Sequence, residues 1–173
     1  QGSIMKIVIH RGTKEIGGTC VELIARTSRI VVDLGIPLVS GKEGQPFDSK
    51  VLEGKTAKQL LNLGILPAVD GLYAGDKPCV DAVLISHSHL DHYGLLRYVH
   101  PDIPIYLSAG ARELINVSDI FTPHRTGSLN SRVVSHGKKV TIGDFSVTPF
   151  LVDHSAFDAL AFLIEDDKSK VFY

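Results

Sequence analysis

The feature that most constrains this chain is a short apolar segment that leads directly into a cluster of histidines. Residues 80–86 form a nearly continuous apolar run, a pattern typical of a strand that is buried on both faces of a sheet. The residues that follow are His87, Ser88, His89, Leu90, Asp91 and His92. A buried strand is therefore expected to bring three imidazoles and a carboxylate to one place in the fold.

These residue types are metal ligands. Imidazole nitrogen and carboxylate oxygen bind Zn²⁺ at about 2.0–2.2 Å, and Mn²⁺ or Fe accept the same donors. His87 and His89 are two positions apart in an extended segment, so their side chains face the same way and can reach one ion. Asp91 and His92 fall where the chain turns into a helix, which directs them to a neighbouring position. The segment predicts a site for two divalent metal ions, most simply zinc.

A less specific interpretation is a loop of surface histidines in which Asp91 only caps a helix. Several imidazoles packed together without partners would be costly, and this disfavours that interpretation. Four further histidines have no neighbours at ligand spacing, and we expect them to be surface or packing residues: His10, His100, His124 and His136.

Two residues outside the cluster are candidates for the same site. His154 follows a strand-like run and could supply a third nitrogen, because three protein ligands plus water make a catalytic zinc site. Taken alone, it could equally be structural. Asp33 ends an apolar run, where a hydrogen bond to a ligating imidazole would satisfy its carboxylate. A turn residue before Gly35 is the alternative for Asp33.

Apolar periodicity predicts a layered α/β domain. Strands are expected near both ends of the chain, at 5–10, 20–26, 29–33, 139–142, 145–152, 160–164 and 171–173. The middle is expected to hold helices at 91–99 and 109–120, a strand at 103–107, a weaker helical pattern at 51–63 and a loop at 122–135. This order predicts two sheets covered by helices.

The length of 173 residues suits one domain, and we expect a single domain over 1–173. The net charge of −1 gives no sign of the general attraction to phosphates that marks many nucleic-acid-binding proteins. A local basic patch is still compatible with this charge. Cys20 and Cys79 suggest no disulfide framework and are expected to be small buried residues, so a reducing cytoplasm is predicted. No apolar run is long enough to cross a membrane, so no membrane partner is expected. The sequence is compatible with a homo-oligomer. Residues 1–3 are expected to be the remnant of a cleaved tag.

The segment from His87 to His92 resembles the second signature motif of the metallo-β-lactamase superfamily. The sequence VVDLG at 31–35 is similar to the first motif, and LVDHS at 151–155 is similar to the third. The sequences GTKEIGGTC at 12–20 and HSAFDA at 154–159 are similar to ribonuclease J and its RNA-processing β-CASP relatives.

The resemblance implies an αββα sandwich of two mixed sheets covered by helices. It also implies that His154 completes the ligands of the first metal, that Asp33 orients the site, and that Asp91 contributes to catalysis as well as to metal binding. Ser155 is a weaker candidate for contact with substrate. A fourth motif, whose Asp bridges both ions in the family, would follow residue 173, so the second site is expected to be incomplete here and the fragment inactive.

For the longer parent protein, the resemblance implies a metal-dependent hydrolase that cleaves phosphodiester bonds, with RNA as the expected substrate. The first alternative is a hydrolase of the same fold that acts on a small ester, thioester or lactam, because a fold does not dictate a substrate. The second is a non-catalytic metal-binding module.

Overall fold

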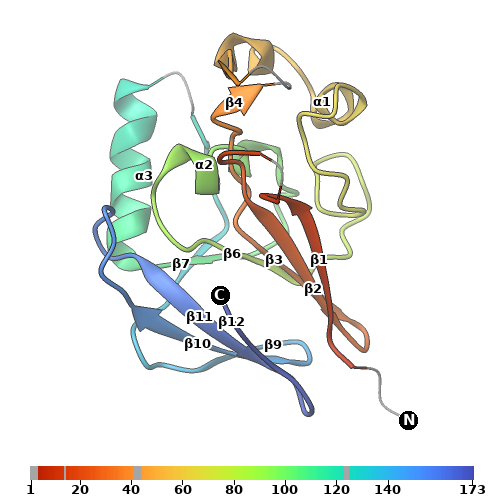
Figure 1. Ribbon diagram of the computed structural model, residues 1–173, viewed down its shortest axis with the longest axis vertical. Coiled ribbons are helices and arrows are strands. Elements are labelled where there is room, and N and C mark those ends of the chain that lie inside the picture. The colour runs from red at the N-terminus through yellow and green to blue at the C-terminus, as the bar shows by residue number, and fades with distance from the viewer. Residues whose placement is uncertain (1–3, 14, 41–43, 123–124) are drawn as a thin grey trace.

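The computed structural model describes residues 4–13, 15–40, 44–122 and 125–173. Figure 1 shows two sheets packed against each other, with the helices gathered on one side of the larger sheet. The larger sheet has six strands in the order β1 (Lys6–Arg11), β2 (Cys20–Ala25), β3 (Ser28–Val32), β6 (Ala82–Leu84), β7 (Ile105–Leu107) and β8 (Ser131–Val133). The smaller sheet has four, in the order β12 (Lys170–Phe172), β11 (Leu160–Glu165), β10 (Phe145–Leu151) and β9 (Val140–Ile142). The predicted layered α/β class is confirmed.

Apart from one helix of 13 residues, the helices and the remaining strands are short. The α-helices are α1 (Ala57–Asn62), α2 (Leu90–Tyr93) and α3 (Ala109–Phe121), and the 3-10 helices are η1 (Ser49–Leu52) and η2 (Leu96–Tyr98). Strands β4 (Val39–Ser40) and β5 (Gln45–Pro46) pair only with each other. Helix α1 begins with a capping box between Thr56 and Gln59, and Ser108 caps α3 by accepting from the backbone N–H of Ala111.

The larger sheet is buried on both faces, which explains the apolar sequences of its central strands. In β3, Ile30 and Val32 pack in the core between the two sheets, whereas Val31 packs in the core beneath the helices. Strand β6 alternates in the same way, with Leu84 toward the smaller sheet and Val83 toward the helices. The prediction of a fully buried strand at 80–86 is correct in its centre.

The larger sheet is mixed, as predicted: β1, β2 and β3 pair antiparallel, and β3, β6, β7 and β8 pair parallel. The smaller sheet differs from the expectation, because its four strands are antiparallel throughout. Short turns join β9 to β10 and β11 to β12, and such turns permit only antiparallel pairing. In the part of the chain that the structure describes, no helix covers the outer face of this sheet, where Phe172 is exposed beside Phe150.

The expected single helix at 91–99 is wrong in its continuity. Helix α2 ends at Tyr93, with Gly94 as its C-cap, and η2 follows after a break. The backbone N–H of Leu95 donates to the carbonyl of Leu34, so a tertiary contact replaces the next helical hydrogen bond. The pattern at 51–63 likewise divides into η1 and α1, which lie on either side of Gly54.

The expected loop at 122–135 contains β8, an edge strand parallel to β7. The carboxylate of Asp119 accepts hydrogen bonds from the backbone of Thr126 and Gly127, which holds part of the preceding segment. The predictions for residues 1–3 and for His124 lie outside the described residues. Among the helices that the structure describes, none is long and apolar enough to cross a membrane.

Candidate metal centre

The register of β3 and β6 places the first elements of the site. These strands are parallel neighbours, with Val32 beside Leu84, so their carboxyl ends meet at the same edge of the sheet. Asp33 follows β3 and Ser86 lies just beyond β6. The chain after Ser86 then carries the histidine motif beyond the carboxyl end of β6, one of the two central strands of the sheet.

Three imidazoles converge at this edge. His87 Nε2 lies 3.1 Å from His89 Nδ1 and 3.2 Å from His154 Nε2. One ligand nitrogen of each ring lies within 4.8 Å of the other two. His154 arrives from the loop that follows β10, far along the sequence. Burial decreases across the group, because His87 is buried, His89 is half-buried and His154 is exposed.

A buried carboxylate orients the rings. Asp33 is fully buried and accepts four hydrogen bonds: from the Ser86 N–H (2.8 Å), the Ser86 hydroxyl (2.8 Å), His92 Nδ1 (2.7 Å) and the Tyr173 hydroxyl (2.7 Å). The Ser86 hydroxyl also lies 2.9 Å from His87 Nδ1. Because that hydroxyl gives its one proton to the carboxylate, it accepts from His87, and His87 carries its proton on Nδ1.

This network places a proton on Nδ1 of both His87 and His92. With Nδ1 protonated, His87 Nε2 presents a lone pair toward His89 and His154. His92 also donates from Nδ1, and its Nε2 lies 3.5 Å from Asp91 Oδ2. Asp33 thus directs one ring nitrogen toward the three-histidine group and another toward Asp91.

Asp91 and His92 lie beside that group as a separate pair. The rings of His87 and His92 have centroids 4.0 Å apart. The backbone carbonyl of Asp91 accepts from the N–H groups of Gly18 (3.1 Å) and Thr19 (3.2 Å), which fixes the start of α2 against the loop that precedes β2.

The crossing at Gly35 brings α2 against the end of β3. Leu34 N–H donates to His92 O (2.7 Å) and Ile36 N–H donates to Leu90 O (2.9 Å). A Cβ at Gly35 would lie 1.6 Å from the carbonyl oxygen of Asp91. Only glycine permits this approach, and it sets the position of both Asp91 and His92.

The pKa values of two histidines are shifted in opposite directions. Burial, reinforced by His92, lowers the pKa of His87 to about 4, so His87 is neutral near pH 7. Burial also opposes protonation of His92, but the hydrogen bond and charge of Asp33 outweigh it and raise the pKa of His92. A neutral imidazole is the form that binds a metal ion.

The three-histidine group fits a metal ion. Imidazole nitrogens bound to one zinc ion at about 2.0–2.1 Å in tetrahedral positions lie about 3.3 Å apart. The two nitrogen separations that involve His87, 3.1 and 3.2 Å, match that spacing, and the separation between His89 and His154 is within 4.8 Å. His87 presents an unprotonated nitrogen to the same point, so the donor chemistry fits as well as the distances.

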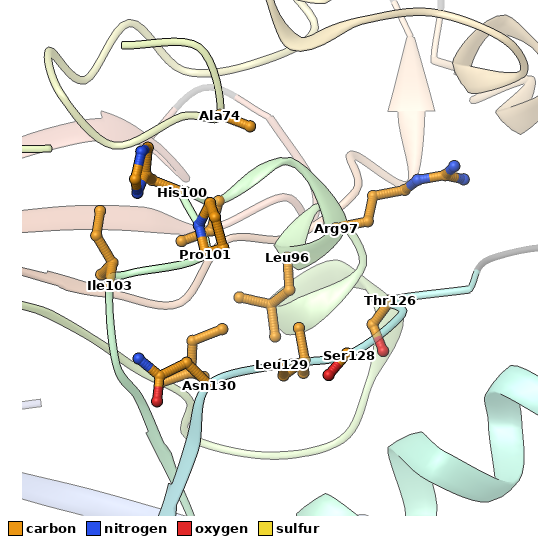
Figure 2. A pocket seen from close by; sticks show the side chains of 12 residues that line it. Ala74, Leu96, Arg97, His100, Pro101, Ile103, Thr126, Ser128, Leu129 and Asn130 are labelled. Atoms are coloured by element: carbon orange, nitrogen blue, oxygen red, sulfur yellow. The ribbon is translucent and has the colours of Figure 1, made fainter. Parts of the chain in front are cut away.

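An open hollow of about 560 Å³ adjoins the group. Two of the candidate metal ligands, His89 and Asp91, line it, and so does Ser155, the candidate for substrate contact. A separate cavity of about 280 Å³, which Figure 2 shows, contains none of the candidate residues; apolar side chains such as Leu96 line it together with the polar side chains of His100 and Asn130.

The remaining histidines that the structure describes lie outside the group. His10 Nε2 pairs with Glu22 (2.8 Å), His100 accepts from the backbone of Asp102, and His136 accepts from the backbone of Leu151. Both cysteines are free. Cys20 is buried as expected, but the expectation is wrong for Cys79, which is exposed; its sulfur contacts Arg29.

Sequence reasoning missed three contributors to the site. Ser86 directly precedes the motif, so its position was a usable signal. The closeness of Gly35 to Asp91 and the bond from Tyr173 to Asp33 depend on tertiary crossings, and no local pattern marks them.

Comparison with known proteins gives the family. The model of the "Beta-lactamase superfamily domain" matches residues 67–173. The transcription termination factor FttA of Methanothermobacter thermautotrophicus is 30% identical over 134 residues, which are 74% of this chain and 18% of that protein. The ribonuclease J of Sinorhizobium meliloti is 27% identical over 116 residues, 62% of this chain and 20% of that protein. The chain thus spans about a fifth of the length of these relatives.

Solved structures share the fold. A protein of unknown function from Enterococcus faecalis V583 aligns with a TM-score of 0.82 and 24% identity, over 99% of this chain and 43% of that one. The metallo-β-lactamase fold protein YhfI from Bacillus subtilis aligns with a TM-score of 0.60 and 18% identity, over 98% of this chain and 62% of that one. The family model, the fold and the histidine motif agree, and the chain belongs to the metallo-β-lactamase superfamily.

Proposed function

We propose that this chain forms part of a metal-dependent hydrolase that cleaves phosphodiester bonds in RNA. The observation that carries the proposal is the convergence of the His87, His89 and His154 nitrogens within 4.8 Å of one another. These residues would hold one divalent ion, and Asp91 with His92 would hold a second beside it. Zinc is the proposed ion because the donors are mostly nitrogen, and Mn²⁺ or Fe would bind the same residues.

When bound, such ions lower the pKa of a water molecule and offset the charge on phosphoryl oxygens. The residues of this chain do the positioning. Asp33 holds the rings of His87 and His92, one through Ser86 and one directly. Asp91 lines the hollow, and we propose that it also orients the attacking water and receives its proton.

RNA is the proposed substrate because of the relatives. One is named a ribonuclease, and another is named a transcription termination factor. The alignments cover about a fifth of each relative, so residues elsewhere in a longer polypeptide would contribute to RNA binding. A cytoplasmic location stays a prediction from cysteine usage.

Within the described residues, Asp91 and His92 supply two ligands to the second position. Two ligands hold an ion less firmly than three, so we propose that this chain alone binds the second ion weakly and turns over substrate poorly. Tests of activity therefore require the natural full-length polypeptide.

The test combines metal analysis with cleavage of a labelled single-stranded RNA by that polypeptide. His89→Ala is expected to lower metal content and to reduce kcat/KM by about 100-fold or more. His100→Gln is the matched control, because His100 lines the separate cavity and should behave as the native protein does. Absence of bound metal, or undiminished RNA cleavage by His89→Ala, would falsify the proposal.

Two other outcomes identify the alternatives. Turnover of a small ester, thioester or lactam with no RNA cleavage would indicate a different hydrolase of the same fold. Bound metal combined with full biological function in Asp91→Ala would indicate a non-catalytic metal-binding module.

A further inference from the structure

The loop that carries His154 is fastened to the start of α3. The Val152 N–H donates to Ala159 O (3.1 Å), which closes the loop. The Ser108 hydroxyl donates to Asp158 O (2.7 Å), and the Gly110 N–H donates to Asp158 Oδ2 (2.8 Å). Asp158 adopts a left-handed backbone conformation at φ +58°. These bonds hold the residues after His154 in one arrangement.

Phe157 stands exposed on this fastened loop. Its relative exposure is 74%. The ring packs by one edge on Gly110, where a Cβ would lie 2.7 Å from both Cδ1 and Cε1. A single exposed aromatic residue is common on protein surfaces, so exposure alone indicates nothing. The position is informative, because Phe157 lines the same hollow as His89 and Asp91.

Apart from the candidate metal ligands His89 and Asp91, the lining of that hollow is uncharged. Its volume of about 560 Å³ is within the range of small-molecule sites. Three serines line it, Ser88, Ser118 and Ser155. No lysine or arginine is among the described residues that line it, so it offers no counter-charge to a phosphate. Apolar and aromatic side chains complete the lining, namely Leu38, Leu90, Tyr93, Leu114, Ala156 and Phe157.

We infer that this hollow binds one nucleobase of the RNA substrate, with the ring of Phe157 as the stacking surface. The inference rests on the proposed function, since the phosphate next to that base would lie at the three histidines. Stacking uses the π-face that every base has, and the serine hydroxyls can bond to base edges or to the ribose. By holding the base, the hollow would position the neighbouring scissile phosphate, although no lysine or arginine is among the described residues that line it.

The experiment measures kcat/KM of the full-length polypeptide on a single-stranded RNA and on RNAs with one abasic nucleotide, scanned along the sequence. One abasic position next to the cleavage site is expected to reduce kcat/KM by roughly 5- to 150-fold, the range of one base stacked on an aromatic ring. On the intact RNA, Phe157→Ala should reduce kcat/KM by the same factor. On that abasic RNA, Phe157→Ala and the native protein should have equal kcat/KM.

Three variants separate stacking from support of the loop. Phe157→Tyr should restore cleavage, whereas Phe157→Leu, which still covers Gly110, should not. Phe121→Ala is the matched control, because Phe121 is 81% exposed on α3 and does not line the hollow. The metal content of all three should equal that of the native protein.

The two proposals fail in different ways. If the native protein cleaves RNA and Phe157→Ala cleaves it equally well, or loses equally on intact and abasic RNA, the base site is refuted and the ribonuclease proposal stands. If the native protein cleaves no RNA, both are refuted.

Discussion

The hydroxyl of Tyr173 donates a 2.7 Å hydrogen bond to Asp33 Oδ2, although 140 positions separate the two residues. Tyr173 follows β12 of the smaller sheet, and Asp33 follows β3 of the larger one. This bond joins the two sheets at the edge where the histidines converge. Burial raises the pKa of Tyr173 well above its ordinary value, so the hydroxyl remains a donor at neutral pH.

Tyr173→Phe removes that donor and keeps the ring. The carboxylate of Asp33 retains its other partners, so we expect a loss of about 1 kcal/mol in the free energy of unfolding. Urea denaturation measures it. Tyr106→Phe is a control, because the Tyr106 hydroxyl accepts from Arg132 and lies outside the site. Equal stability of Tyr173→Phe and the native chain would show that the bond contributes nothing.

Ser86→Ala breaks the link between Asp33 and His87. We expect His87 to lose its preference for the Nδ1-protonated tautomer, and zinc affinity to fall by about 10- to 100-fold. Nitrogen-15 NMR of labelled histidines reads the tautomer directly, and chelator competition reads the affinity. Ser86→Thr, which keeps the hydroxyl, should restore both, and Ser128→Ala in the separate cavity should change neither. An unchanged His87 spectrum in Ser86→Ala would exclude the tautomer assignment.

Gly35→Ala places a methyl group on the carbonyl of Asp91. Because the backbone itself must move, we expect a loss of about 3 kcal/mol or more in stability, with loss of metal binding. Gly54→Ala is the comparison, since a Cβ there meets nothing within 4 Å and only the positive φ is penalised, at about 1 kcal/mol. Urea denaturation measures the free energy of unfolding of both variants. Equal losses in Gly35→Ala and Gly54→Ala would contradict the close approach at Gly35.

The two cysteines should differ in reactivity. Burial raises the pKa of Cys20 to about 12, so its thiol stays protonated and shielded over the usual labelling range, whereas Cys79 is exposed. Ellman's reagent at pH 8 is expected to titrate one thiol in the folded chain and both in urea. Cys79→Ser should give no reaction until it unfolds. Rapid labelling of both thiols in the native chain would disprove the burial of Cys20.

Metal binding should stabilise the chain. Zinc at 100 times its dissociation constant would add about 2.7 kcal/mol to the free energy of unfolding and raise Tm. Differential scanning calorimetry with and without a chelator measures the shift, and His154→Ala should abolish most of it. A Tm unaffected by zinc would argue against the three-histidine site.

The sequence could predict features that depend on residues close together in the chain, but not those that depend on contacts between distant segments. The spacing of His87 and His89 follows from the two-residue period of an extended segment, so their convergence could be predicted. The buried strand before them followed from its apolar run. Helix 91–99 could not be placed correctly, because the contact between Leu34 and Leu95 that interrupts it comes from a distant segment.

Other details depend on pairing partners that no short pattern specifies. The edge strand β8 is short, and its burial is slight, so its sequence carries little apolar signal. The sequence could place Asp33 at the end of a strand, and it predicted a hydrogen bond between the Asp33 carboxylate and a ligating imidazole. That it also holds Ser86 and Tyr173 required the parallel register of β3 with β6 and the packing of the two sheets.

The register of β3 with β6 has a consequence for how proteins of this kind diverge. The orientation of His87 and His92 inherits the rigidity of the sheet centre, through Asp33 and Ser86. Leu38, Leu114 and Ser118 also line the hollow but carry none of the site's rings, and they are not part of that framework. Such positions can change without turning the rings of His87 and His92, so the molecules that the hollow accepts can change while the orientation of these two rings persists.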